Sequence, residues 1–326
     1  MFPKLIRLSL LMCLLAVTPV HAKVFKIATI APEGTAWMKA MRAGAAEVKQ
    51  RTAGRVVFKF YPGGVMGNDE NVLRKMRIGQ LHGGAITSGS LERIYRDISI
   101  YNLPFLFSSF EQVDAARAGL DAKLIAGLEK KGFVSFGFAE GGFSYMMSDR
   151  EMTTIESMQG RKVWIPVGNE VGEIVFGHAG ISPVALPLSD VMTGLQTGLV
   201  DTVIASPIGA LALQWHTRIS FAVDLPLTYY TGTMVLSKRA FDRIKPEDRD
   251  IVREVMNDVF VAIDKQNRED NIAAKQALVN QGIRFDVLAP EVEEAWLEVG
   301  RKALADIEKK SGFTPALYDQ LMGYVR

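Results

Sequence analysis

The sequence contains a single cysteine, Cys13, only four histidines, and no block of like charge. One cysteine rules out a framework of internal disulfides, and the chain has no thiol nucleophile beyond its first residues. His82, His178 and His216 are far apart and lack the spacing of metal ligands. No stretch after the first residues reaches the ~18 apolar residues of a membrane-spanning helix. Nucleic-acid tails, disordered chains and membrane-embedded proteins are therefore excluded.

The first 22 residues have the pattern of a secretory signal peptide. Lys4 and Arg7 precede a largely apolar stretch, residues 8–17, and Val20-His21-Ala22 is a small-residue cleavage site. Removing Lys4 and Arg7 from the 38 basic residues leaves 36, equal to the number of acidic residues. We therefore expect a formally neutral mature chain, without cysteine, in the periplasm.

The pattern of the mature chain predicts an α/β protein. The full sequence of 326 residues exceeds the ~250–300 at which a single core stops growing, so two domains are expected. Residues 24–30, 55–60 and 85–87 read as strands. Between them, helices are expected after Thr35 and after Asn68, two residues that cap helices well. This alternation is typical of βαβ units on a parallel sheet.

A similar unit recurs later in the chain. Ser189 is placed to cap a helix that ends at Gly198 and is followed by a strand over 199–205. The repeat suggests two similar lobes, although coincidence between two ordinary units explains it equally well. After a strand at 234–237, a helix beginning at Pro246 has no breaker before Gly282, and its length predicts that it spans both lobes. A helix over 290–310 closes the predicted fold.

We find no constellation of catalytic residues. The sequence has neither a phosphate-binding Walker motif nor a Gly-x-Ser-x-Gly elbow. Glu291 and Glu294 share a helix face, but acidic residues in a first turn are commonly solvated and complement the helix dipole. We therefore expect no enzyme, no cofactor and no metal. A two-lobed receptor that closes over a small solute by hinge motion fits best.

Five stretches, in this order, resemble the extracytoplasmic solute-binding subunits of tripartite ATP-independent periplasmic (TRAP) transporters. They are Tyr61-Pro62-Gly63-Gly64 with Gly67-Asn68-Asp69-Glu70, Leu103-Pro104-Phe105-Leu106-Phe107, Met158-Gln159-Gly160-Arg161-Lys162-Val163-Trp164, Leu195-Gln196-Thr197-Gly198-Leu199-Val200-Asp201 and Leu236-Ser237-Lys238-Arg239-Ala240-Phe241.

The resemblance implies a fold of the periplasmic-binding-protein type, with two α/β lobes around a central cleft, hinge strands and a long bridging helix. We expect residues 23–143 and 231–270 to form lobe I, and residues 144–230 and 271–326 to form lobe II. The resemblance further implies that the protein delivers its solute to TRAP membrane permease subunits, in transport that is driven by an ion gradient.

The sequence departs from this family at the expected ligand site. Typical members carry an arginine at the position that we align with Trp164, and often a second one at the position of Ser144. A guanidinium binds a carboxylate through two parallel hydrogen bonds, which neither tryptophan nor serine reproduces. Arg161 is expected to point to the other face of its strand. The hypothesis is therefore an apolar or aromatic solute, with a cationic solute near Glu70 or Glu33 as a further option. The predicted ligand-binding residues are Trp164, Ser144, Tyr145, Trp37, Glu70, Phe105, Leu188, Ser206 and Tyr229.

Other functions stay open at this point. A signalling receptor that docks on a sensor kinase or chemoreceptor would have the same fold, as would the binding protein of an ATP-driven importer. An enzyme on a binding-protein scaffold would need an acid–base set, which we do not find. An apolar solute would also call for a periplasmic helper protein, because such a solute partitions poorly from water.

Overall fold

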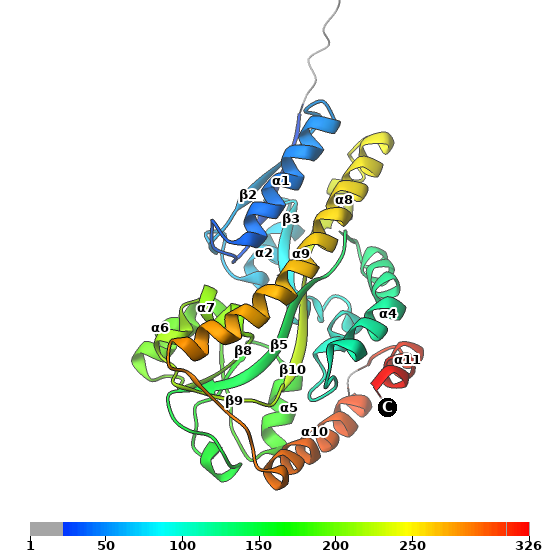
Figure 1. Ribbon diagram of the computed structural model, residues 1–326. Coiled ribbons are helices and arrows are strands. Elements are labelled where there is room, and N and C mark those ends of the chain that lie inside the picture. Colours follow the sequence, from blue (N-terminus) through cyan, green and yellow to red (C-terminus); the bar gives the residue numbers. More distant parts are fainter. Residues whose placement is uncertain (1–21, 311, 326) are drawn as a thin grey trace, which may run out of the picture.

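The computed structural model describes residues 22–310 and 312–325, so the expected leader, except for Ala22, lies outside the described residues. Two α/β halves share one curled mixed sheet of nine strands (Figure 1). The path through this sheet is β11-β9-β5-β10-β3-β1-β2, while β4 pairs with β10 and β8 with β5. Within the described residues, no helix is both long enough and apolar enough to cross a membrane.

The first half contains the predicted βα units. β1 (Lys23–Ala28) pairs in parallel with β2 (Val56–Tyr61) and with β3 (Gly83–Thr87). The connecting helices are α1 (Ala36–Arg51) and α2 (Asp69–Arg77). The hydroxyl of Thr35 accepts a hydrogen bond from the backbone of Met38, and the side chain of Asn68 caps α2 in the same way. Both capping predictions are confirmed.

Two long strands run between the halves and correct the expectation of a parallel sheet. β5 (Ala139–Ser148) and β10 (Thr228–Ser237) are antiparallel to each other, and β10 is also antiparallel to β3. Their register shifts between Tyr230 and Thr231, so that Gly141 has no partner on β10. Such a bulge bends the strand that carries it, and here it lies midway between the halves.

The second half is built on the other end of β5. β8 (Thr202–Ala205) and β9 (Phe221–Val223) pair with it in antiparallel orientation, and β11 (Arg284–Asp286) extends the sheet beside β9. A separate parallel pair is formed by β6 (Trp164–Pro166) and β7 (Val184–Leu186). The helices of this half are α5 (Glu170–His178), α6 (Val191–Thr197) and α7 (Pro207–Ala212). Ser189 does not cap α6, because Asp190 is the capping residue and its side chain forms no capping hydrogen bond.

Helix α9 (Pro246–Asn280) runs along both halves, as predicted, over 35 residues (Figure 1). It packs on α1 in the first half, on β5 in the middle and on α7 in the second half. The remaining elements are α3 (Ser88–Leu91), α4 (Phe110–Lys130), β4 (Phe133–Ser135), α8 (Lys238–Phe241), α10 (Pro290–Lys310) and α11 (Pro315–Val325).

The expected lobe boundaries fall inside three shared elements. The divisions at 143/144, 230/231 and 270/271 lie within β5, β10 and α9 respectively. Helix α10 packs on α5, but α11 packs on α4, so part of the segment expected in lobe II lies against lobe I. The lobe boundaries therefore stay a proposal.

Candidate functional site

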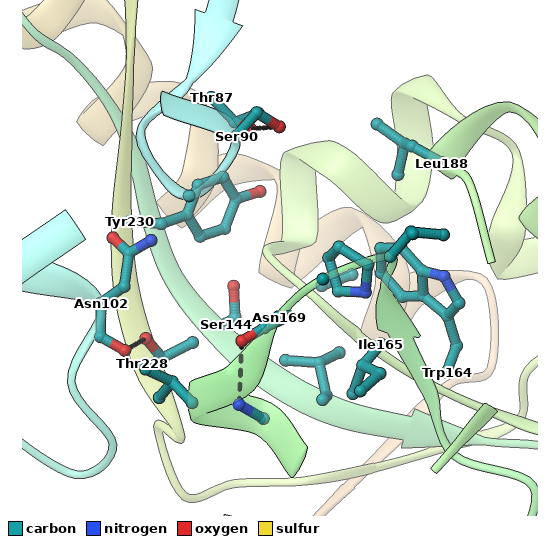
Figure 2. Close-up of a pocket in the computed structure, with 18 of the residues that line it drawn as sticks. Thr87, Ser90, Asn102, Ser144, Trp164, Ile165, Asn169, Leu188, Thr228 and Tyr230 are labelled. Carbon is teal, nitrogen blue, oxygen red and sulfur yellow. Dashed lines mark hydrogen bonds between the residues drawn. The ribbon is translucent and has the colours of Figure 1, made fainter. Parts of the chain in front are cut away.

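A cavity of about 290 Å3 lies between the two halves, lined by residues from both. The first half contributes the carboxyl end of β3 and the start of α2. The second half contributes β6, the start of α5 and the segment around Leu188, while β5 and β10 supply Ser144 and Tyr230 between them (Figure 2). This is the place where ligands bind in open α/β sheets, at the carboxyl ends of strands.

Trp164 forms part of the apolar wall in the second half. Its side chain is 4% exposed, and its ring meets that of Trp215 edge to face, with 5.2 Å between the centroids. Its indole nitrogen donates a hydrogen bond of 3.0 Å to the carbonyl of Leu186. Trp164 therefore presents only aromatic surface to a solute, and its N–H is not available as a donor.

Ser144 and Tyr230 face the cavity from the two hinge strands. The Ser144 hydroxyl is buried and has no hydrogen-bond partner among the described residues. The Tyr230 hydroxyl lies 3.2 Å from the Ser206 hydroxyl, and burial raises the pKa of Tyr230. Both side chains therefore keep neutral hydroxyls at the cavity near neutral pH.

The wall in the first half is acidic and polar. Asp69 accepts hydrogen bonds from the backbone and the hydroxyl of Thr87, at 3.1 and 3.0 Å, and burial raises the pKa of Asp69. Glu92 pairs with Arg96 at 3.1 Å, and burial raises its pKa as well. Of the described residues that line the cavity, none is a lysine, an arginine or a histidine.

Four of the nine predicted ligand residues line the cavity: Trp164, Ser144, Glu70 and Leu188. Tyr145 lies on the opposite face of β5 from Ser144 and packs against Phe285. Tyr229 likewise lies on the opposite face of β10 from Tyr230, and its hydroxyl accepts a long hydrogen bond of 3.4 Å from Arg117. Neither residue lines the cavity, because successive side chains of a strand point to opposite faces.

The other three predicted residues also lie outside the cavity lining. Trp37 packs with the core between α1 and α9. Phe105 has φ +50° and packs against Trp296, with the ring centroids 6.5 Å apart. Ser206 caps α7 and acts on the cavity only through its contact with Tyr230.

Arg161 does not replace the missing cation. Its side chain is 8% exposed and donates to the carboxylate of Asp149 at 2.8 Å and to the hydroxyl of Ser148 at 2.8 Å. Lys162 donates to the carbonyl of Gly198 at 2.7 Å. Glu33, the other acid considered, is paired with Arg42 and is not part of the lining.

Sequence reasoning missed several polar residues at the cavity, among them Asn102, Asn169 and Thr228. Asn169 caps α5, and Thr228 donates to the backbone of Asn102 at 2.8 Å. Thr87 and Ser90 follow the predicted strand at 85–87, so the rule for carboxyl ends of strands would have indicated them. Asn102 carries no comparable signal, because it ends a 3-10 helix, Arg96–Asn102, and not a strand.

The geometry gives no sign of a metal centre or a catalytic set. Within the described residues, no group of three or more His, Cys, Asp or Glu side chains could hold a metal ion. The unpartnered polar atoms at the cavity are suited to hydrogen bonding with a solute.

Comparisons with known proteins agree with this architecture. A periplasmic C4-dicarboxylate-binding protein, DctP of Rhodobacter capsulatus, is 24% identical over 254 residues, covering 76% of this chain and 75% of its own. A TRAP periplasmic solute-binding protein of Shewanella oneidensis with bound succinate superposes with a TM-score of 0.85 at 19% identity, covering 94% of this chain and 100% of that one.

A second solved structure, a TRAP periplasmic solute-binding protein of Haemophilus influenzae with bound L-gulonate, also has a TM-score of 0.85, at 15% identity, and covers 92% of this chain and 99% of that one. The family model for bacterial extracellular solute-binding proteins of family 7, DctP, matches residues 27–311. The chain therefore belongs to the DctP family of extracellular solute-binding proteins, the solute-binding proteins of TRAP transporters.

Proposed function

We propose that this TRAP-type receptor captures an apolar or aromatic solute rather than a simple carboxylate. The observation that carries the proposal is the absence of any basic side chain among the described residues that line the cavity. A carboxylate that left water for this site would find acidic side chains in the lining and no basic one, and the nearby Arg96 is already paired with Glu92. An unpaired buried charge costs several kcal/mol.

The two positions at which the family resemblance leads us to expect arginine support this proposal. Trp164 and Ser144 both line the cavity, so the replaced side chains lie at the site itself. The relatives described above are named for C4-dicarboxylates or hold succinate or L-gulonate, and all of these are carboxylates. In this chain the corresponding wall offers an indole ring and a hydroxyl instead.

Capture would proceed by closure of the two halves about β5 and β10, and the closed receptor would deliver its solute to membrane permease subunits from the periplasm. Flexing about the bulge in these strands would move the wall that carries Trp164 against the wall that carries Glu70. A solute of this kind would also favour a periplasmic helper protein that limits its exposure to water. The two lining carboxyl groups with raised pKa, Asp69 and Glu92, are engaged by Thr87 and Arg96 respectively, so neither is placed as a free acid or base.

The test is to purify the mature protein without added ligand and to identify, after denaturing extraction, whatever molecule co-purifies. We expect mass spectrometry to find an aromatic or lipid-like molecule that carries no carboxylate. The variant Trp164→Ala should lose it, because the variant removes an indole ring from the apolar wall. The matched control is Trp37→Ala, which removes the same side chain outside the cavity and should retain the molecule.

A dicarboxylate or keto acid in the extract would overturn the proposal. So would retention of the molecule by Trp164→Ala while the fold of that variant is intact by circular dichroism.

A further inference from the structure

The two ends of the cavity differ in chemistry. In the second half the wall consists largely of side chains without hydrogen-bonding capacity toward the cavity, including Trp164, Ile165 and Leu188 (Figure 2). In the first half the lining includes Asp69, Glu70, Thr87, Ser90, Glu92 and Asn102, which we call the polar end. A solute that fills both ends needs an apolar body and one polar head.

At the polar end, the side-chain oxygens of Asn102 and Glu70 have no hydrogen-bond donor among the described residues. Thr87 and Ser90 lie 2.9 Å apart, hydroxyl to hydroxyl, and Thr87 also donates to Asp69. The side-chain oxygen of Asn102 is buried and has no partner among the described residues. Glu70 is exposed at the start of α2 and forms no ion pair with the described residues. An amide oxygen and a carboxylate accept hydrogen bonds but cannot donate them.

The Ser144 hydroxyl adds an independent sign that a ligand belongs here. Its residue is 1% exposed, its oxygen is unpartnered among the described residues, and it projects toward the space between Tyr230 and Asn169 (Figure 2). A buried hydroxyl without a partner is unfavourable until a ligand meets it. Because a hydroxyl both donates and accepts, it accommodates a donor head.

We propose that the solute carries a protonated amine as its polar head, placed at the acidic polar end with its apolar body against Trp164. The proposal rests on the function proposed above and specifies the chemical class of that solute. An ammonium has three donors and no acceptor, so it would pair with the carboxylate of Glu70 and donate to the side-chain oxygen of Asn102. A carboxylate head would be repelled by Glu70 and would have only the amide N–H groups of Asn102 and the nearby hydroxyls as donors, whereas an alcohol would lack the charge that attracts Glu70.

The start of α2 does not reverse this preference. A helix N-terminus attracts anions, but the Asn68 side chain already caps α2, and Asp69 and Glu70 occupy its first turn. The two carboxylates therefore already complement the positive end of the helix. Glu92 adds no free charge, since it is paired with Arg96.

The experiment compares straight-chain primary amines of four to ten carbons with the alcohols and carboxylates of the same lengths. The mature full-length protein is first freed of co-purified solute by reversible unfolding, and binding is measured by calorimetry at low salt. We expect the best amine to bind about tenfold or more tightly than its alcohol, as charge-assisted hydrogen bonds imply. Its affinity should fall as salt is added, because Glu70 is exposed.

Two variants test whether Glu70 is responsible for the tighter binding of the amine. Glu70→Gln should abolish the advantage of the amine over the alcohol without weakening the alcohol. The matched control, Glu291→Gln, removes an exposed glutamate from the first turn of α10 and should leave both affinities unchanged.

The outcomes separate this inference from the function on which it rests. If alcohols bind as tightly as amines, or if no amine of the series binds, the ammonium proposal is overturned. The proposed function is then decided by the solute identified in the extraction experiment. If a carboxylate binds best, both fail. An amine advantage that persists in Glu70→Gln overturns the assignment of Glu70 as the partner of the head.

Discussion

Single residues at the cavity show that strand geometry determines which of two neighbouring side chains can contact a solute. Ser144 and Tyr230 line the cavity, whereas Tyr145 and Tyr229, the residues next to them, do not. A strand alternates its side chains between two faces, so each pair must divide in this way. The sequence could not show which member faces inward, because β5 is buried on both faces and β10 alternates only between buried and half-buried side chains near Tyr230.

Residues that cap helices were more predictable than residues that bind. Thr35 and Asn68 are confirmed as caps because the capping hydrogen bond depends only on the next three residues. Ser189 failed as a cap because a short turn over Leu188–Asp190 precedes α6, and the Ser189 hydroxyl donates to Asp190 instead. Trp164 was placed correctly at the cavity by the family resemblance, not by any local pattern.

Asp248, in the first turn of α9, gives a prediction about pH. Its side chain is 1% exposed and receives two hydrogen bonds from Arg55, at 2.6 and 2.9 Å. These hydrogen bonds hold the pKa of Asp248 below its ordinary value. Because the unfolded chain then binds the proton more tightly, the pair stabilises the fold above the ordinary pKa of an aspartate, and this contribution is lost as the pH falls through the lowered value.

We therefore expect Asp248→Asn to lower the midpoint of thermal unfolding by roughly 2–4 °C at neutral pH. The difference from the wild type should shrink as the pH is lowered from about 5 to about 3. Scanning calorimetry across this range measures it. Glu247→Gln, an exposed acid in the same helix turn, controls for the helix dipole and should change the midpoint less. A difference that stays constant down to pH 3 would contradict the linkage.

At the scale of elements, α9 holds β5 at its bulge through polar side chains. The carboxylate of Asp264 accepts a hydrogen bond from the backbone N–H of Glu140 at 2.7 Å. Asn267 donates to the carbonyl of Glu140 at 2.8 Å, and Asn271 donates to that of Gly141 at 3.3 Å. The bulged backbone thus keeps partners where the register of the sheet is broken, and the bend is fixed relative to the bridging helix.

Gly142 is required at this bend by its backbone conformation. Its φ is +87°, and a Cβ atom placed there would lie 2.8 Å from the side-chain nitrogen of Asn271. We expect Gly142→Ala to reduce the free energy of unfolding by about 1–3 kcal/mol, since a left-handed backbone is strained for alanine. Urea titration followed by circular dichroism measures this.

The control for Gly142→Ala is Gly177→Ala. Gly177 lies in α5, where a Cβ atom would have no neighbour within 4 Å, and alanine there should be neutral or slightly stabilising. If both substitutions shift the unfolding midpoint equally and in the same direction, the requirement for glycine at the bend is wrong.

Long elements were easier to predict than the order of the sheet. The 35 residues of α9 carry a helical period without a breaker, and α10 was predicted over the same residues that it occupies, Pro290–Lys310. The antiparallel crossing of β5 and β10 was not predicted, because strand direction depends on contacts between segments far apart in the chain. Helix α11 was missed for the same reason, since it packs on α4 about 200 residues earlier.

At the scale of the whole molecule, the halves are not independent units. The nine-stranded sheet continues through β5 and β10, and one cluster of buried apolar residues includes Leu120 of α4 as well as Phe176 of α5. An ion-pair network joins α4 to α9, with Arg117 bound to Asp264 at 2.8 Å. The closure proposed above would therefore bend shared elements instead of separating two folded bodies.

This sharing predicts that the protein unfolds in one cooperative transition. Trp37 packs against the core of the first half, Trp164 and Trp215 belong to the core of the second, and Trp296 of α10 lies in the cluster that includes residues of both halves. Loss of either core would leave half of α9 and one end of both long strands without packing, so neither half should persist alone. We expect the fluorescence of the wild type and of Trp37→Phe, and the far-ultraviolet circular dichroism, to give coincident urea midpoints. The fluorescence of Trp37→Phe reports chiefly on the second half. If its urea midpoint differs from the circular dichroism midpoint of the same variant, the halves are separate folding units and β5 and β10 only link them.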